Sequence, residues 1–409
     1  MLEKALLYAQ SGGPTSVINS SACGVIRQAQ KEGLKVYVAL NGVDGIFKGN
    51  IVDVSTEDSK QIDKLCGTPA SAFGSCRIKL PDYRVDDSKY FALLETFKKL
   101  NVRYFIYNGG NDSMNTCAKV AEFMKNNDYE CYVMGVPKTI DNDLLLTDHC
   151  PGYGSAAKYI ATTCYEIGLD TAVYSSGRVT VMEIMGRDAG WLTASSALAG
   201  LNGHAPDLIY LPERAFDLED FCKRCEEVYS RKKSCLVAVS EGIRDKDGEY
   251  ISNYAKQGEK DAFNNTQLGG VGAFLADYVT QKTGIKSRAI ELSLMQRCAA
   301  HLCSKTDVEE AFEAGRYAVK AAVAGETGKM IAFKRKSNEP YEIEYVAMPL
   351  DDIAKFTQSM PDEYIGEDGC SVTQAFIDYA KPLIQGEMPV EYVNGLPVYA
   401  KLKNQPIKF

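Results

Sequence analysis

The chain has 409 residues, of which 45% are hydrophobic and 24% charged, and its net charge is −8. This length exceeds what one hydrophobic core usually organises, so two domains are expected. The negative charge argues against a general nucleic-acid-binding protein, because such proteins present a basic field to the phosphate backbone. No apolar run reaches the roughly 20 residues that span a bilayer, and no signal-peptide pattern is present, so we expect no membrane association.

The cysteines are scattered, and their number, thirteen, is odd. One Cys-x-x-Cys pair, Cys222 and Cys225, lies in a charged helical segment without a second pair or nearby histidines, which makes it a weak zinc signal. Scattered thiols without a secretion signal indicate a reducing compartment, and the expected location is the cytoplasm.

Short apolar runs that end in glycine or polar residues alternate with segments of helical spacing. Strands are predicted at Ala5–Ala9, Val36–Leu40, Tyr104–Tyr107, Tyr132–Val136, Val179–Ile184, Leu208–Leu211, Leu236–Val239, Lys329–Phe333 and Tyr341–Val346. Helical spacing occupies intervening segments such as Thr15–Gln30 and Ser113–Lys125, and a further helix is predicted near Pro349–Phe356. This alternation indicates an α/β fold whose largely parallel sheets are flanked by helices.

No linker or repeat divides the chain, so a domain boundary is expected where the chain crosses between compact units. We expect one crossing shortly after Gly154 and a return near Gln296. The predicted domains are therefore residues 1–154 with about 297–350, and residues 155–296 with part of about 351–409.

In parallel α/β sheets, ligands bind beyond the carboxyl ends of the strands, where this chain has four polar, glycine-rich junctions. The first, Ser11-Gly-Gly-Pro-Thr15, leads into a helix expected to begin near Thr15. Its glycines allow close backbone approach, Pro14 suits a first helical turn, and the helix N-terminus can hold a phosphate. A plain tight turn is the alternative. The dinucleotide fingerprint Gly-x-Gly-x-x-Gly is absent, which argues against a nicotinamide-dependent dehydrogenase.

The second junction, Asn108-Gly-Gly-Asn-Asp-Ser113, also follows a strand and precedes a helix. Asp112 and Ser113 either cap that helix and do nothing more, or surround a phosphate and its Mg²⁺, which prefers hard oxygen ligands.

The third junction, Gly135–Asp143, places Lys138, Thr139 and two aspartates within six positions at a strand end. A structural loop rarely needs this combination. Phosphoryl transfer requires positioning, neutralisation of charge and a carboxylate that accepts the proton of the attacking hydroxyl. We therefore interpret this segment as catalytic.

The fourth junction, Met185–Gly190, carries Arg187, whose planar fork suits either a phosphate or a surface ion pair. Further candidates for an anion pocket are Arg77, Lys79, Arg178, Arg288 and Arg297, with Glu241 as a carboxylate at another strand end.

Together these motifs resemble the phosphofructokinase family, from about Ala5 to Pro349 or beyond. The residues that carry the resemblance are Ser11–Pro14, Gly109–Ser113, Pro137–Asp143, Met185–Arg187, Glu241–Gly242 and Gln296–Arg297. The combination of Lys-Thr-Ile-Asp-Asn-Asp with a downstream Met-Gly-Arg is highly specific for this family.

The resemblance implies a role for each matching position. Asp141 would be the general base for the 1-hydroxyl of fructose 6-phosphate, Asp143 would support the metal and the loop, and Thr139 would hydrogen-bond in the site. Fructose 6-phosphate would be bound by Met185, Gly186, Arg187, Glu241, Arg288 and Arg297. Arg178 and Arg288 would reach into the neighbouring subunit's site, which implies a homodimer or homotetramer. The donor would bind the first domain and the sugar the second, with the active site in the cleft between them.

The choice of phosphoryl donor is argued from two positions. Relatives that use ATP have glycine where this chain has Asp112, so here a carboxylate would occupy the space of the α-phosphate and repel it. They also have glycine in place of Lys138, which can pair with the phosphoryl group in transfer. The resemblance therefore implies the pyrophosphate-dependent branch, with Mg²⁺ as cofactor. Residues assigned to the donor are Gly13, Arg77, Lys79, Gly110, Ser113 and Lys138.

Two positions depart from the family pattern. Asn111 stands where most relatives carry an aspartate associated with Mg²⁺, although its carbonyl oxygen remains a possible ligand and Asp112 and Asp143 would compensate. Leu294 stands where relatives place a histidine or tyrosine that touches the 6-phosphate, so substrate affinity would be weaker.

The expected reaction forms fructose 1,6-bisphosphate and phosphate, reversibly, in glycolysis or gluconeogenesis. An ATP-dependent phosphofructokinase and a non-catalytic regulatory homologue remain the alternatives.

Overall fold

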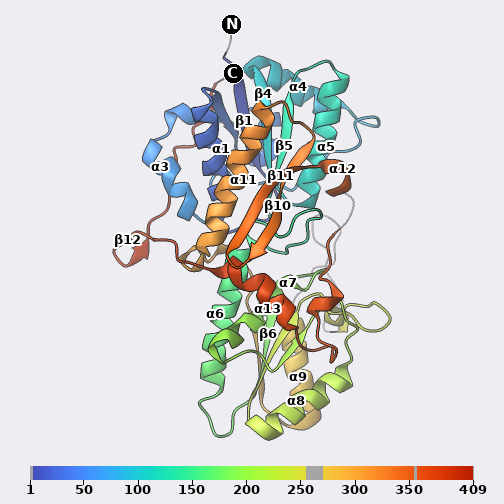
Figure 1. Cartoon of the computed structure of the whole chain (residues 1–409). Coiled ribbons are helices and arrows are strands. Elements are labelled where there is room, and N and C mark those ends of the chain that lie inside the picture. The colour runs from blue at the N-terminus through green and yellow to red at the C-terminus, as the bar shows by residue number, and fades with distance from the viewer. Residues whose placement is uncertain (1–2, 255–269, 354–356, 409) are drawn as a thin grey trace. The chain divides into compact units, whose positions relative to one another are not determined.

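A computed structural model of the chain describes residues 3–254, 270–353 and 357–408 (Figure 1). The chain forms two compact units. The first comprises residues 1–155, 297–357 and 385–409, and the second comprises residues 156–296 and 358–384. The assignment of the donor to one unit and of the sugar to the other stays a prediction.

The first unit is built on a seven-stranded sheet of order β11-β10-β5-β4-β1-β2-β3. Its strands are β1 Ala5–Gln10, β2 Lys35–Ala39, β3 Ile51–Asp53, β4 Val102–Gly109, β5 Tyr132–Pro137, β10 Lys329–Asn338 and β11 Tyr341–Pro349. The five strands from β10 to β2 are parallel, whereas the edge strands β3 and β11 run antiparallel to their neighbours. The carboxyl ends of β5, β4 and β1 therefore lie side by side.

Helices cover both faces of this sheet. They are α1 Ile18–Lys31, α2 Gly42–Phe47, α3 Ser59–Asp63, α4 Ser88–Leu100, α5 Asn111–Asn126, α11 Lys305–Val323 and α12 Leu350–Ile353. Alternate residues of β1 enter different cores: Leu6 packs in the core formed by α1 and α11, and Leu7 packs in the core formed by α4 and α5. This alternation is the period of a strand buried on both faces.

Close approach of α1 and α11 depends on two glycines (Figure 1). A Cβ atom on Gly24 would lie 2.0 Å from the backbone oxygen of Phe312, and one on Gly315 would lie 2.2 Å from the backbone oxygen of Ser21. The helices can therefore touch backbone to backbone only because both positions lack a side chain.

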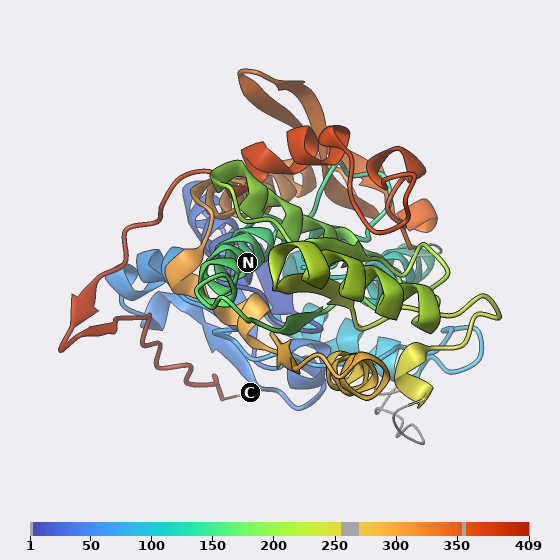
Figure 2. The same ribbon diagram turned by 90° about the horizontal axis from the view of Figure 1, so that it is seen from below.

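The second unit has a four-stranded parallel sheet of order β7-β8-β6-β9. Its strands are β6 Val179–Ile184, β7 Leu208–Tyr210, β8 Cys235–Ser240 and β9 Ser287–Glu291, and its helices are α7 Trp191–Ser195, α8 Leu218–Lys232, α9 Val271–Thr283 and α13 Gln374–Ala380. Two further helices, α6 Tyr153–Thr171 and α10 Met295–Cys298, each begin in one unit and end in the other. Short 3₁₀ helices lie at Val54–Thr56, Lys64–Gly67, Ser196–Asn202, Ile251–Tyr254, Ala300–Leu302, Asp362–Tyr364 and Lys381–Ile384. Near the C-terminus, β12 Tyr392–Val393 and β13 Leu396–Pro397 form a small hairpin that projects from the first unit in both views (Figure 2).

The predicted α/β fold with largely parallel, helix-flanked sheets is confirmed. One helix start was wrong: α1 begins at Ile18 and not near Thr15, so Pro14 lies in the preceding loop. The Thr15 hydroxyl accepts a hydrogen bond from the backbone N–H of Val17 and holds a local turn there instead. Of the helix predicted near Pro349–Phe356, α12 accounts for Leu350–Ile353, and residues 354–356 lie outside the described part. In the described residues, no helix is both long and apolar enough to cross a membrane.

Candidate active site

Three of the four predicted junctions meet at one edge of the seven-stranded sheet. They follow β1, β4 and β5, which are neighbours in the sheet. The backbone N–H of Ser11 donates to the Asn108 carbonyl (2.9 Å), and that of Lys138 donates to the Gly109 carbonyl (3.0 Å). The three segments are therefore tied to one another directly beyond the strand ends, where ligands bind in this class of sheet.

The turn at Gly12 and Gly13 is lined by cations. Gly12 adopts φ +78°, a conformation that favours glycine, and a Cβ atom there would lie 3.2 Å from Lys138 Nζ. A Cβ atom on Gly13 would lie 3.1 Å from Arg297 Nη1 and 3.7 Å from Arg77 Nη2. Three positive side chains thus converge on a backbone with no side chain of its own, which is the arrangement that a phosphate requires.

Lys138 lies at the centre of this group and is 4% exposed. Its ammonium group donates a 2.5 Å hydrogen bond to the Gly13 carbonyl. Burial lowers the pKa of Lys138 to about 8; Asp141 and Asp143 oppose this shift, while Arg297 and Arg77 add to it. The lysine is therefore poised to gain stabilisation from a bound anion.

Asp141 is half-buried in the loop between β5 and α6. Its backbone N–H donates to the Thr139 hydroxyl at 3.1 Å, so Thr139 shapes the turn that carries the predicted base. The next residue, Asn142, has φ +56°, and its side-chain oxygen accepts a hydrogen bond from the Cys150 backbone at 2.8 Å. The loop is thus held by its own side chains.

Asn111 is the predicted metal ligand, with Asp112 and Asp143 as possible further ligands, and Asn111 contacts Asp143. Asn111 Nδ2 donates to Asp143 Oδ2 at 3.1 Å, while Asn111 Oδ1 is buried and has no hydrogen-bond partner within the described part of the chain. A buried, unsatisfied amide oxygen beside a carboxylate fits a hard cation such as Mg²⁺. The described residues contain no cluster of three or more histidine, cysteine or acidic side chains that would hold a metal alone. Mg²⁺ would therefore depend on phosphate oxygens for further ligands.

Asp112 lies in the first turn of α5, where its carboxylate forms a 3.1 Å ion pair with Lys79. Both side chains are more than half exposed. The N-cap of α5 is Gly110, so neither Asp112 nor Ser113 caps this helix as the structural alternative proposed. Ser113 is buried instead, and it fits only because Gly109 lacks a Cβ atom, which would lie 2.0 Å from the Ser113 hydroxyl.

The fourth junction belongs to the second unit, where β6 and β8 are neighbours. The backbone N–H of Gly186 donates to Glu241 Oε1 at 3.3 Å, and that of Met185 donates to Gln296 Oε1 at 3.2 Å. Gln296 was not among the predicted site residues, although it adjoins Arg297 in one of the motifs. The structure thus brings Glu241 next to the Met185-Gly186 turn, and the role that the resemblance implies for these residues stays a prediction.

Arg187 Nε is buried without a hydrogen-bond partner in the described residues, which leaves a guanidinium donor available to a ligand. Gly242, which follows Glu241, packs against the backbone of Arg187. A side chain cannot fit at position 242, because a Cβ atom there would lie 1.9 Å from the Arg187 carbonyl oxygen. Burial raises the pKa of Glu241, with a smaller opposing effect from the Gly186 N–H. These features make the turn at Met185–Arg187 a second candidate site for an anion, separate in sequence from the first.

Arg178 and Arg288 do not join that group within one chain. Arg178 precedes β6, at the end of the sheet opposite Met185, which is roughly 20 Å away at the rise of a β-strand. Arg288 is paired with Thr180 on the edge strand β9 and is exposed. Leu294 is 54% exposed just beyond β9. Their predicted contacts with the sugar phosphate stay predictions.

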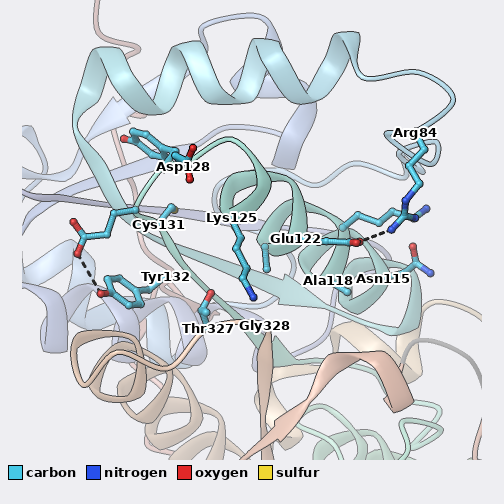
Figure 3. A pocket seen from close by; sticks show the side chains of 14 residues that line it. Arg84, Asn115, Ala118, Glu122, Lys125, Asp128, Cys131, Tyr132, Thr327 and Gly328 are labelled. Atoms are coloured by element: carbon cyan, nitrogen blue, oxygen red, sulfur yellow. Dashed lines mark hydrogen bonds and ion pairs between the residues drawn. The ribbon is translucent and has the colours of Figure 1, made fainter.

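A groove of about 920 Å³ lies elsewhere on the first unit (Figure 3). It runs along α5 and is lined by residues that include Arg84, Glu122, Lys125, Tyr132 and Thr327. Arg84 pairs with Glu122 across it. None of the predicted site residues lines this groove, so it is not the predicted site.

The fold and the glycine-lined cationic turn define a phosphate-binding α/β protein. Residues 5–322 match the family model described as Phosphofructokinase. The chain belongs to the phosphofructokinase family.

Its relatives include proteins named pyrophosphate–fructose 6-phosphate 1-phosphotransferase. That of Halomonas elongata is 44% identical over 414 residues, covering 100% of this chain and 98% of the relative. That of Xanthomonas campestris pv. campestris is 44% identical over 403 residues, covering 98% and 96% of the two chains. The crystal structure of a pyrophosphate-dependent phosphofructokinase from Marinobacter aquaeolei is similar with a TM-score of 0.90 and 39% identity, over 99% of this chain and 98% of that one.

Proposed function

We propose that this chain transfers the terminal phosphoryl group of pyrophosphate to the 1-hydroxyl of fructose 6-phosphate. The products are fructose 1,6-bisphosphate and phosphate. The observation that carries the proposal is the convergence of Lys138, Arg77 and Arg297 on the turn at Gly13. Full-length relatives named for this reaction support it.

In this proposal, positively charged side chains bind the phosphates of the donor. The three cations would neutralise the donor phosphates, and Lys138 would follow the phosphoryl group during transfer, where charge stabilisation lowers the barrier most. Gly13, Gly110 and the start of α5 offer backbone to the donor at close range, and Ser113 lies in the same first turn. Asn111, with Asp143 and Asp112 nearby, would hold Mg²⁺, which when bound neutralises and orients the phosphates.

Asp141 is the base in this proposal. Its carboxylate accepts the proton of the 1-hydroxyl as that oxygen bonds to the terminal phosphorus, and the bond from phosphorus to the bridging oxygen breaks. The leaving phosphate keeps the electron pair of that bond. Thr139 maintains the turn that presents Asp141 through the hydrogen bond to the backbone.

The sugar phosphate is assigned to Met185, Gly186, Arg187 and Glu241 of the second unit. Arg187 is half-buried and its Nε donor has no partner in the described residues, which suits it to an oxyanion, and Glu241 is suited to sugar hydroxyls. Arg178 and Arg288 lie at the other end of their sheet and are exposed or half-exposed, which supports a role toward a neighbouring copy in a homodimer or homotetramer. A reversible reaction of glycolysis or gluconeogenesis in the cytoplasm is the setting that we propose.

Asp112 supports pyrophosphate over ATP as the donor. It places a carboxylate in the first turn of α5, beside the predicted donor group, and its ion pair with Lys79 is exposed and therefore weak. A nucleoside triphosphate would bring its α-phosphate charge toward this carboxylate, whereas pyrophosphate ends before it.

The test is the initial rate with fructose 6-phosphate and Mg²⁺, measured with pyrophosphate and with ATP at equal concentrations. We expect turnover with pyrophosphate and a rate with ATP that is lower by a factor of at least about 100. Preference for ATP would show instead an ATP-dependent phosphofructokinase. Inactivity with both donors, in protein that is folded and binds pyrophosphate, would favour the regulatory homologue.

A further inference from the structure

A buried network of charges adjoins the loop that carries Lys138 and Asp141, and the mechanism above does not use it. His149 is 2% exposed. Its Nδ1 atom lies 2.7 Å from Asp148 Oδ1, and its Nε2 atom lies 2.7 Å from Glu310 Oε2. A neutral imidazole has one N–H and can donate to only one of these carboxylates. Both are satisfied when His149 is an imidazolium.

The outer ends of the network are also satisfied. Arg335 Nε and Nη2 donate to Asp148 Oδ1 at 3.0 and 2.7 Å, and the Tyr341 hydroxyl donates to Glu310 Oε1 at 2.6 Å. The charges of Arg335, Asp148, His149 and Glu310 alternate in sign. Burial lowers the pKa of His149, but Glu310 and Asp148 outweigh it and raise that pKa to about 9. A complete network of this kind is how buried charges are tolerated.

This network fixes the second half of the loop to two elements far away in the sequence. Glu310 lies on α11 and Arg335 on β10. The Asp148 backbone N–H donates to the Phe333 carbonyl at 2.8 Å, and the His149 ring packs on the Phe333 ring with centroids 4.9 Å apart. The segment around His149 is therefore held by backbone pairing, ring packing and ion pairs together.

The first half of the loop carries the predicted catalytic side chains, and its position is fixed by hydrogen bonds to the second half. The Thr139 N–H donates to the Pro151 carbonyl at 3.2 Å, and the Cys150 N–H donates to Asn142 Oδ1 at 2.8 Å. Asn142 is the residue between Asp141 and Asp143. A displacement of the segment at His149 would thus be transmitted to the predicted base through two short connections.

Helix α11 also holds the end of the loop through a second carboxylate. Asp307, one turn before Glu310, accepts hydrogen bonds from the backbone N–H groups of Gly152 and Ser155, both at 2.9 Å. Asp307 is buried, and burial raises its pKa to about 6. One helix therefore anchors the loop at two successive points.

We propose that His149 is a positioning residue for phosphoryl transfer, because its bridge between Asp148 and Glu310 locks the loop that aligns Asp141 and Lys138. This inference rests on the proposed function for its kinetic consequence. Transfer needs the attacking oxygen, phosphorus and leaving oxygen in line, so a small displacement of the base lowers turnover more than it lowers binding.

The primary test replaces His149 with phenylalanine, which keeps a ring against Phe333 but removes both bridges. We expect kcat to fall by about 10- to 100-fold while KM for each substrate changes by less than about threefold. Amide hydrogen exchange in residues 138–152 becomes faster. Glu313→Gln is the matched control: it lies on the same helix and breaks a 2.6 Å ion pair with Arg316, and it leaves both readouts unchanged.

A double variant separates positioning from simple loss of stability. In His149→Phe the buried Glu310 carboxylate keeps the Tyr341 hydroxyl but loses its cationic partner; adding Glu310→Gln removes that buried charge, so the Tm of the double variant recovers relative to His149→Phe. Its kcat stays low, because the bridge is still absent. If His149→Phe does not fold, kcat and loop exchange are measured on the double variant instead.

The proposal is overturned if folded His149→Phe keeps kcat within about twofold of the wild type, or if kcat recovers together with Tm in the double variant. Unchanged loop exchange would also overturn it. A wild-type chain that is inactive with pyrophosphate would instead refute the proposed function, and the exchange measurement would still report on the anchoring of the loop.

Discussion

Lys138 Nζ and the Gly13 carbonyl oxygen are joined by a 2.5 Å hydrogen bond that connects the ends of two parallel strands 125 positions apart. The bond places a buried ammonium group against a glycine turn that Arg77 and Arg297 also approach. Burial is the main cause of the lowered pKa of Lys138, and the positive charges of Arg297 and Arg77, unfavourable in the absence of an anion, add to it.

The first prediction concerns pH. Because the pKa of Lys138 is lowered to about 8, the ammonium form is lost from the free enzyme as pH rises through that value. We expect kcat/KM for pyrophosphate to fall above pH of about 8. Lys138→Arg, whose guanidinium stays charged, should lack this limb, and since pyrophosphate itself titrates equally in both assays, the difference isolates position 138. Identical profiles for the two proteins would contradict the assignment.

The same shift predicts how stability depends on pH. The unfolded-state pKa of a lysine is near 10.4, so between about 8 and that value the unfolded chain binds more protons at this position than the folded chain. The contribution of Lys138 to the free energy of unfolding therefore rises with pH across this window. Added pyrophosphate should reduce the effect, because an anion favours the charged form.

The second prediction concerns the donor. Asp112→Gly together with Lys138→Gly should shift the ratio of kcat/KM values from pyrophosphate toward ATP by about 10-fold or more, since the repelling carboxylate is gone. Asp82→Gly, which removes an exposed carboxylate outside the predicted site, is the control. A double variant that loses pyrophosphate activity but leaves the ATP rate unchanged would show that position 112 does not exclude the nucleotide.

The third prediction concerns the metal. Asn111→Ala removes the unsatisfied buried oxygen and should raise the Mg²⁺ concentration for half-maximal rate by about 10- to 100-fold. Asn115→Ala, one turn further along α5, should leave it unchanged. Equal Mg²⁺ dependence in the two variants would remove Asn111 from the metal site.

The fourth prediction tests the packing of the first unit. Gly24→Ala places a Cβ atom 2.0 Å from the Phe312 carbonyl oxygen and should lower the free energy of unfolding by about 1–3 kcal/mol or more. Gly67→Ala has nothing within 4 Å of the new Cβ atom and should change stability little. Chemical denaturation of both variants checks this, and equal stabilities would mean that α1 and α11 move apart at little cost.

Sequence alone identified the parts of the fold with local signals. The short apolar runs predicted β1, β4 and β5, and the polar, glycine-containing segments after them marked the junctions at Gly13, Gly110 and Lys138. It did not identify β3 or β9, because both are short edge strands and β9 mixes polar and apolar residues. The start of α1 was misplaced, since a proline fits both a first helical turn and the loop before it.

Long-range relationships were beyond local patterns. Nothing near Arg77 indicates that it shares a turn with Arg297, 220 positions later, because their meeting depends on how the sheet orders its strands. The bridge from His149 to Glu310 could not be predicted from the sequence either, because the fold brings these distant residues together. An isolated buried histidine has no signature in one sequence until its two carboxylate partners are placed in space.

The most direct test of the proposed chemistry is kcat of Asp141→Ser with pyrophosphate, fructose 6-phosphate and Mg²⁺. We predict a loss of about 100-fold to 10,000-fold with the dissociation constants of both substrates little changed, because the variant lacks the acceptor for the 1-hydroxyl proton. Near wild-type turnover in this variant would contradict the account.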